Sequence, residues 1–246
     1  MNSLPIIREP RKQIKSQTID QFTQLITLFE IGISLLVDCT NILKDEGSSL
    51  SLETAEGASK FATWRFLSTL PISIVWCFDI AQNGDYLISK NLLRLSIEES
   101  IKLAYYATHP GQALRQIVQD RDSDEINFSN MIEELNLKHG KGILNLYGRL
   151  SNLYVHANLN LPPEIVYEEK DLALIGGGSR YIPNLFEAIV HQLLVLIANA
   201  LKYVFVRFPV LDENEKWFLN YSLFLEKAIL VVPSTDDSGE ASSDKS

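Results

Sequence analysis

The chain has 246 residues, which suits one large domain or two small ones. Hydrophobic residues make up 46% and charged residues 22%, so the composition supports a sizeable core and excludes wholesale disorder. The net charge of −9 excludes the broad basic face of most nonspecific nucleic-acid binders, although a local basic site stays open. Two cysteines are too few for a disulfide framework or a cysteine-based zinc site.

The two ends of the chain differ in composition from the body. Residues 1–15 are basic, contain prolines and lack the apolar segment of a signal peptide, so we expect a flexible N-terminal segment. Residues 233–246 are rich in serine and aspartate, and we expect a disordered acidic tail. Residues 16–232 are expected to form a single helical domain.

Apolar residues recur every three or four positions along most of the body, which predicts α-helices. The predicted helical segments are 17–44, 53–82 with a kink or break at Pro71, 85–108, 111–121, 129–136, 138–155, 183–207 and 213–230. Residues 164–176 interrupt this pattern and predict a small β-hairpin or an irregular excursion. The expected fold class is all-α: a bundle of about six or seven helices, with room for one small β-hairpin.

Two apolar stretches, 22–37 and 189–206, raise the question of a membrane span. Both contain polar side chains that are costly at bilayer depth, such as Glu30 in the first and Lys202 in the second. We therefore expect buried helices of a soluble bundle, no membrane partner and a cytoplasmic location.

Most familiar catalytic motifs are missing from the sequence, including the glycine-rich nucleotide-binding motifs, HExxH and GxSxG. A phosphate cradle at Gly176-Gly177-Gly178 is less common than a plain glycine-rich connector. The four histidines show no i, i+4 pair and no carboxylate placed to complete a metal triad. We therefore expect neither a bound metal nor a cofactor.

One predicted helix carries a polar stripe made of Arg149, Asn152 and His156. Spacings of three and seven residues place the three side chains on one helix face. An arginine, an amide and an imidazole together are able to grip an anion and to move a proton. The alternative is a polar face that meets solvent or a salt link between helices. Arg149, His156 and Asn152 are our candidate catalytic residues.

Arg94 and Glu98 form a second polar pair, four residues apart on an otherwise apolar helix with the sequence LLRLSIEESIKLAYY. Such a pair is either a solvated face or a buried ion pair directed at another polar group, and both alternatives stay open. We expect the pair to face the helix that carries His156 and to support the catalytic residues.

The segment Arg149-LSNLYV-His156 in an all-α chain resembles the HEPN superfamily, in a longer R-x6-H variant. The pairing of LLRLSIEE with a later L-S-x-x-x-V-H element is similar to a related family of uncharacterised prokaryotic helical proteins. The resemblance covers roughly residues 85–160. The chain departs from better-known members in two ways: Asn152 does not directly follow the arginine, and residues 164–178 are an additional excursion.

The resemblance implies metal-independent RNA cleavage in a toxin–antitoxin or phage-defence setting, at a composite site built across a homodimer. His156 would act as general base on the ribose 2′-hydroxyl or as general acid, and Arg149 would stabilise charge on the phosphorane. Many members of the superfamily are instead noncatalytic. Two main hypotheses therefore stay open: a ribonuclease with an RNA substrate, and a helical interaction or scaffold module that binds a protein partner or an antitoxin. A small-molecule enzyme of unknown type is a third alternative.

Overall fold

A computed structural model describes residues 4–48, 50–116, 126–137, 140–151, 166–169, 172–175 and 181–231. These residues contain α1 (Leu4–Ile42), α2 (Lys44–Ser48), α3 (Ala55–Gln82), α4 (Tyr86–Thr108), α5 (Pro110–Leu114), α6 (Phe128–Glu134), α7 (Gly140–Leu150), α8 (Pro183–Arg207), a 3-10 turn (Pro209–Leu211) and α9 (Glu215–Val231). The strands β1 (Val166–Glu169) and β2 (Leu172–Ile175) pair antiparallel, with Val166 opposite Ile175. The predicted all-α fold class is confirmed.

The helix count differs from the six or seven expected from the sequence, because the described residues hold nine α-helices. Two of the nine, α2 and α5, have five residues each. A helix this short covers little more than one turn, so it shows no repeating apolar pattern that a sequence analysis detects.

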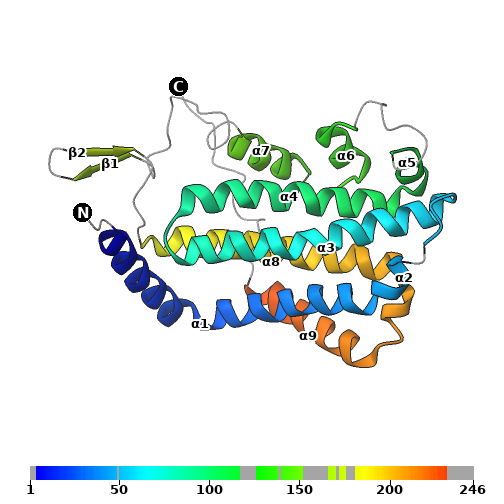
Figure 1. The fold of residues 1–246 in the computed structure, drawn as a ribbon, viewed down its shortest axis with the longest axis horizontal. Helices are drawn as coiled ribbons and strands as arrows, with labels where there is room; N and C mark the ends of the chain where they lie inside the picture. The colour runs from blue at the N-terminus through cyan, green and yellow to red at the C-terminus, as the bar shows by residue number, and fades with distance from the viewer. Residues whose placement is uncertain are drawn as a thin grey trace, which may run out of the picture.

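The helices are arranged around α3 and α4, which form an antiparallel hairpin (Figure 1). The hairpin turns at Asn83 and Gly84, and Gly84 has φ 80°, a left-handed value that glycine adopts without steric cost. On one side of the hairpin lie α1 and α9, and on the other side lie α5, α6 and α7 (Figure 1). The apolar helix α8 packs against α1, α3 and α4 and so completes the core.

The predicted break at Pro71 does not occur, since α3 is one helix from Ala55 to Gln82 with Pro71 buried inside it. The irregular point lies instead in α1, where Phe22 has non-helical backbone angles (φ −115°, ψ 26°). The ring of Phe22 packs on that of Phe186 from α8, with centroids 5.2 Å apart. Tertiary packing therefore places the bend of α1 at a residue with no helix-breaking chemistry.

The expected flexible segment 1–15 is helical from Leu4 onward in the structure. Arg11 forms an ion pair with Asp85 at 2.7 Å, between its guanidinium and the carboxylate before α4. Ile14 and Thr18 are buried, four residues apart, and they extend the inner face of α1 toward the N-terminus. The expected acidic tail, 233–246, lies outside the described residues.

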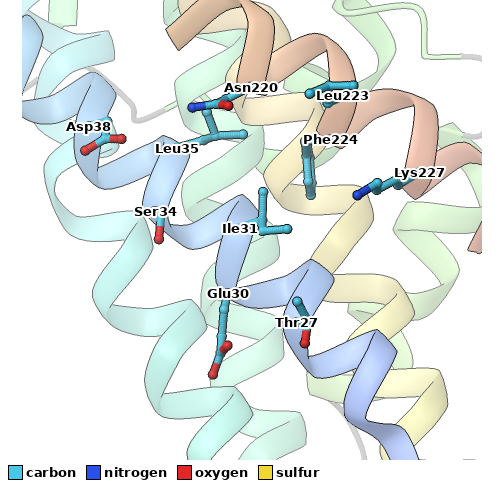
Figure 2. A pocket seen from close by; sticks show the side chains of 10 residues that line it. All are labelled: Thr27, Glu30, Ile31, Ser34, Leu35, Asp38, Asn220, Leu223, Phe224 and Lys227. Carbon is cyan, nitrogen blue, oxygen red and sulfur yellow. The ribbon is translucent and has the colours of Figure 1, made fainter. Parts of the chain in front are cut away.

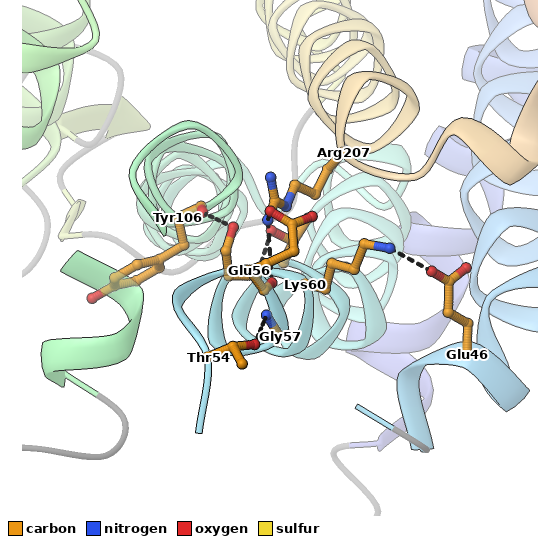
Figure 3. Close-up of polar contacts among 9 residues, drawn as sticks. Glu46, Thr54, Glu56, Gly57, Lys60, Tyr106 and Arg207 are labelled. Carbon is orange, nitrogen blue, oxygen red and sulfur yellow. Dashed lines mark hydrogen bonds and ion pairs between the residues drawn. The ribbon is translucent and has the colours of Figure 1, made fainter. Parts of the chain in front are cut away.

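Polar contacts tie together one end of the bundle (Figure 3). The ammonium of Lys60 in α3 donates to the carboxylate of Glu46 in α2 at 2.7 Å. The guanidinium of Arg207, in the last turn of α8, pairs with the Glu56 carboxylate and donates to the Glu56 carbonyl oxygen at 3.1 Å. Three helices are thereby joined near the N-terminus of α3.

The expectation of no membrane partner is contradicted by the length and composition of three helices. Residues 11–42 of α1, all of α3 and all of α8 are long and apolar enough to cross a membrane, with mean hydropathies of 1.6, 1.3 and 1.8. Of their most apolar windows, 44%, 50% and 44% are buried inside the fold. The expectation was wrong because it rested on single polar residues within two apolar stretches and did not consider the segment that forms α3.

Candidate functional site

Four polar side chains meet at the surface between α4 and α7: two from α4, one from α7 and one from the residue that directly follows α7. Arg94 donates from Nε to the Ser151 hydroxyl at 2.7 Å and from a terminal nitrogen to the Tyr147 hydroxyl at 2.7 Å. The Tyr147 hydroxyl in turn donates to the Glu98 carboxylate at 3.2 Å. We call Arg94, Glu98, Tyr147 and Ser151 the α4–α7 cluster.

The spacing of these residues explains why they meet. Arg94 and Glu98 are four residues apart on α4, and Ser151, which directly follows α7, is four residues beyond Tyr147. Residues at i and i+4 share one helix face, so each helix presents two polar groups to the other. The buried Leu150 beside them holds α7 in the core.

The cluster is partly shielded from solvent. The Arg94 and Glu98 side chains are each 25% exposed, and their closest charged atoms are 3.8 Å apart. The Arg94 guanidinium carbon lies 4.8 Å from the centroid of the Tyr147 ring, and that ring stacks on Phe128 of α6 at 4.1 Å. This arrangement adds a cation–π contact to the hydrogen bonds and fixes the Tyr147 ring.

Burial raises the pKa of the Tyr147 hydroxyl above its ordinary value, and the nearby Glu98 carboxylate raises it further, against an opposing effect of Arg94. The hydroxyl therefore stays protonated near neutral pH and remains a donor to Glu98. Glu98 also pairs with Lys102, four residues further along α4, at 3.0 Å. Arg94 has a terminal nitrogen bound to Tyr147 in α7 and its Nε bound to Ser151 just after α7, so its direct role here is to position the end of α7.

Arg149 lies in the last turn of α7 and is exposed, away from the Tyr147 face. Among the described residues it forms no ion pair. Asn152 and His156 lie outside the described residues, which end at Ser151 in this part of the chain. The structure thus brings Arg94 and Glu98 to α7, while the assignment of Arg149, Asn152 and His156 to one site stays a prediction.

The sequence analysis missed Tyr147 and Ser151. Both were visible as a polar pair with the same i, i+4 spacing as Arg94 and Glu98. Two such pairs on helices expected to touch are a usable signal, because a half-buried arginine needs acceptors on the facing helix.

The remaining histidines of the described residues have other surroundings. His109 stacks on Tyr105 with ring centroids 4.4 Å apart, at the start of α5. His191 is half-buried on α8. Within the part of the chain that the structure describes, no three His, Cys, Asp or Glu side chains are grouped to hold a metal ion.

A cavity of about 370 Å³ lies between α1 and α9, and Figure 2 shows its lining. Glu30 and Asp38 from α1 and Lys227 from α9 line it, together with the apolar side chains of Leu35 and Phe224. None of the candidate catalytic residues lines this cavity. It is therefore separate from the α4–α7 cluster.

Comparison with known proteins gives no relative for this chain: no family model, no curated protein and no solved structure matches it. The α4–α7 cluster therefore has to be interpreted from its own geometry.

Proposed function

We propose that this protein is a HEPN-like, metal-independent ribonuclease. Its catalytic residues are His156 and Arg149, with Asn152 assisting them, and the α4–α7 cluster positions the chain that carries them. The observation that carries the proposal is the pair of hydrogen bonds from Arg94 to Tyr147 and Ser151, which attaches the end of α7 to α4. The toxin–antitoxin or phage-defence setting follows from the resemblance and belongs to the same proposal.

The cluster supports the proposal because of where it acts along the chain. Ser151, held by Arg94, comes directly before Asn152 and five residues before His156. Fixing Ser151 limits the positions open to the residues that follow, and accurate placement is a large part of catalytic power. The same attachment leaves Arg149 on the outer face of α7, where a phosphate is able to reach it.

The proposed reaction is an attack within the RNA strand. His156 takes the proton from a ribose 2′-hydroxyl, and the 2′-oxygen forms a bond to the adjacent phosphorus. The bond from phosphorus to the 5′-oxygen of the next nucleotide then breaks, and that oxygen takes a proton from water as it leaves. Arg149 stabilises the charge on the equatorial phosphorane oxygens through a two-pronged grip.

A noncatalytic interaction or scaffold module is the second candidate, and exposed apolar side chains on the α3–α4 hairpin favour it. Trp76 is 61% exposed, and Ile72, Ile88 and Leu95 are also exposed on the two helices. A large exposed apolar group next to others is typical of a surface that binds another molecule. In this case Arg149 and His156 contact a partner protein and perform no chemistry.

The experiment that separates the two candidates is a cleavage assay of the purified protein on single-stranded and structured RNAs, with EDTA present. The ribonuclease proposal expects cleavage by the wild type and its loss in His156→Ala, with His139→Ala as the matched control that retains cleavage. Circular dichroism of His156→Ala must equal that of the wild type. Absence of cleavage by the wild type, or full cleavage by a folded His156→Ala, rejects the ribonuclease in favour of the module.

A further inference from the structure

A second cavity, of about 320 Å³, lies between α4, α7 and α8. Its volume falls at the lower end of the range found for small-molecule sites. Its apolar walls come from all three helices and include Ile97, Ile101, Ile143, Leu146, Val195 and Leu196.

The α8 wall of this cavity is a single helix face. Ala188, Gln192, Val195 and Asn199 follow one another at spacings of three and four residues, and Tyr203 continues the row. The helix is the most apolar of the three long apolar helices, yet only 44% of its apolar window is buried, and Val195 remains 40% exposed. Covering apolar surface of this kind with an apolar ligand is favourable, because it removes the surface from water.

Four polar side chains on α8 also line the cavity. Within the described residues, His191, Gln192, Asn199 and Tyr203 form no side-chain hydrogen bond to another residue, although all four line the cavity. An amide, a phenol and an imidazole supply both donors and acceptors. No Lys, Arg, Asp or Glu is among the lining residues, so the wall offers hydrogen bonds without a formal charge to pair with.

We propose that this cavity binds an uncharged amphipathic molecule, with an alkyl chain of about ten carbons and a hydroxyl or amide head group. The volume of about 320 Å³ holds about ten groups of the size of a water molecule, at about 30 Å³ each. Counting each carbon of the chain as one such group gives a length of about ten carbons. The alkyl chain contacts Ile97, Ile101 and Leu146, and the head group bonds to Asn199 or Gln192 on α8. This binding site does not depend on the proposed ribonuclease activity.

Titration calorimetry of the full chain with 1-decanol tests the proposal. The wild type is expected to bind saturably with one site, and Val195→Glu is expected to weaken binding about tenfold or more, because it places a carboxylate against the alkyl chain. Val206→Glu is the matched control: the same substitution on the same helix, at a 65% exposed position outside the cavity, with unchanged binding expected. Ala188→Trp, which fills the cavity from an exposed position, is a second blocking variant.

The head group is tested by titrating decanoate at pH 8 in place of 1-decanol. A lining without lysine or arginine predicts that the carboxylate binds about tenfold more weakly than the alcohol. The proposal is overturned if the wild type shows no saturable binding of decanol, if Val206→Glu weakens binding as much as Val195→Glu, or if decanoate binds as tightly as decanol.

Discussion

Arg94 and Tyr147 contact each other in two ways. A guanidinium N–H donates to the Tyr147 hydroxyl at 2.7 Å, and the guanidinium carbon lies 4.8 Å from the centroid of the same ring. The hydroxyl also donates to Glu98, so it bridges the Arg94 guanidinium and the Glu98 carboxylate, whose closest atoms are 3.8 Å apart. Tyr147 is therefore the α7 residue that contacts both members of the Arg94–Glu98 ion pair on α4.

Tyr147→Phe should lower the free energy of unfolding by about 1 kcal/mol or more. The phenyl ring keeps the stacking on Phe128, but an Arg94 N–H and a Glu98 oxygen each lose a partner in a partly shielded place. Urea denaturation followed by circular dichroism measures the change. Tyr203→Phe is the control, because among the described residues the Tyr203 hydroxyl forms no hydrogen bond, and equal losses in both variants would contradict the bridging role.

Gly57→Ala should destabilise the fold by about 2 kcal/mol or more. Gly57 lies in the first turn of α3, where its N–H donates to the Thr54 hydroxyl at 3.0 Å (Figure 3). A Cβ at this position would overlap the backbone carbonyl oxygen of Ser51 and lie 2.9 Å from its carbon, so the backbone must move.

Gly111→Ala is the matched control for Gly57→Ala. A Cβ on Gly111 meets nothing within 4 Å, and the residue is helical in α5. Alanine restricts the unfolded chain, so the free energy of unfolding should rise by about 0.5–1 kcal/mol. Thermal melting distinguishes the two directions, and a Gly57→Ala protein that melts at the wild-type temperature would refute the clash.

The fold class was predictable because apolar residues at three- and four-residue spacing are present in every long helix. What escaped prediction depends on contacts between distant segments. Nothing in the local sequence at Phe22 bends α1, and nothing near Arg11 shows that Asp85 lies within reach. Pro71 shows the reverse: its local signal predicts a break, but the packing around α3 overrides it.

The candidate site was predictable only in part, for a related reason. Arg94 and Glu98 stand out because they are charges on an apolar helix. Tyr147 and Ser151 share their i, i+4 spacing, but a tyrosine and a serine near a helix end have many ordinary roles, so their spacing is informative only together with that of Arg94 and Glu98. Their meaning appears only when α7 is placed on α4, and that placement is set by buried residues such as Leu150.

Stability should fall as the pH rises from about 9 to about 12, in part because of Cys77. Burial raises the pKa of its thiol from 9.0 to about 12, against an opposing hydrogen bond with Ser89. In this pH window the unfolded chain loses the Cys77 proton and the folded chain keeps it. Rising pH therefore lowers the free energy of the unfolded state relative to the folded state.

Cys77→Ser tests this dependence, because serine keeps a hydroxyl near Ser89 and does not titrate in the window. The difference in free energy of unfolding between pH 8 and pH 11, measured by urea denaturation, should be smaller in the variant than in the wild type. Tyrosines with raised pKa values, including Tyr147, contribute equally to both proteins. An identical pH dependence in the two proteins would show that the thiol is not protected in the fold.

Arg149→Lys should reduce RNA cleavage about tenfold or more while leaving the fold intact. Lysine keeps the charge but loses the planar fork that holds two phosphate oxygens at once. The free energy of unfolding should change by less than about 0.5 kcal/mol, because Arg149 is exposed and forms no ion pair among the described residues. Arg115→Lys, at another exposed arginine, serves as the control with cleavage retained.

Arg94→Lys should behave differently from Arg149→Lys, and the contrast tests the two roles. Lysine at position 94 is unable to bond Ser151 and Tyr147 together as the guanidinium does, so α7 loses its attachment to α4. We expect both stability and cleavage to fall in this variant, with stability falling by about 1 kcal/mol or more. Loss of cleavage without loss of stability in Arg94→Lys would instead place Arg94 in contact with the substrate, and loss of stability in Arg149→Lys would remove Arg149 from the proposed phosphate grip.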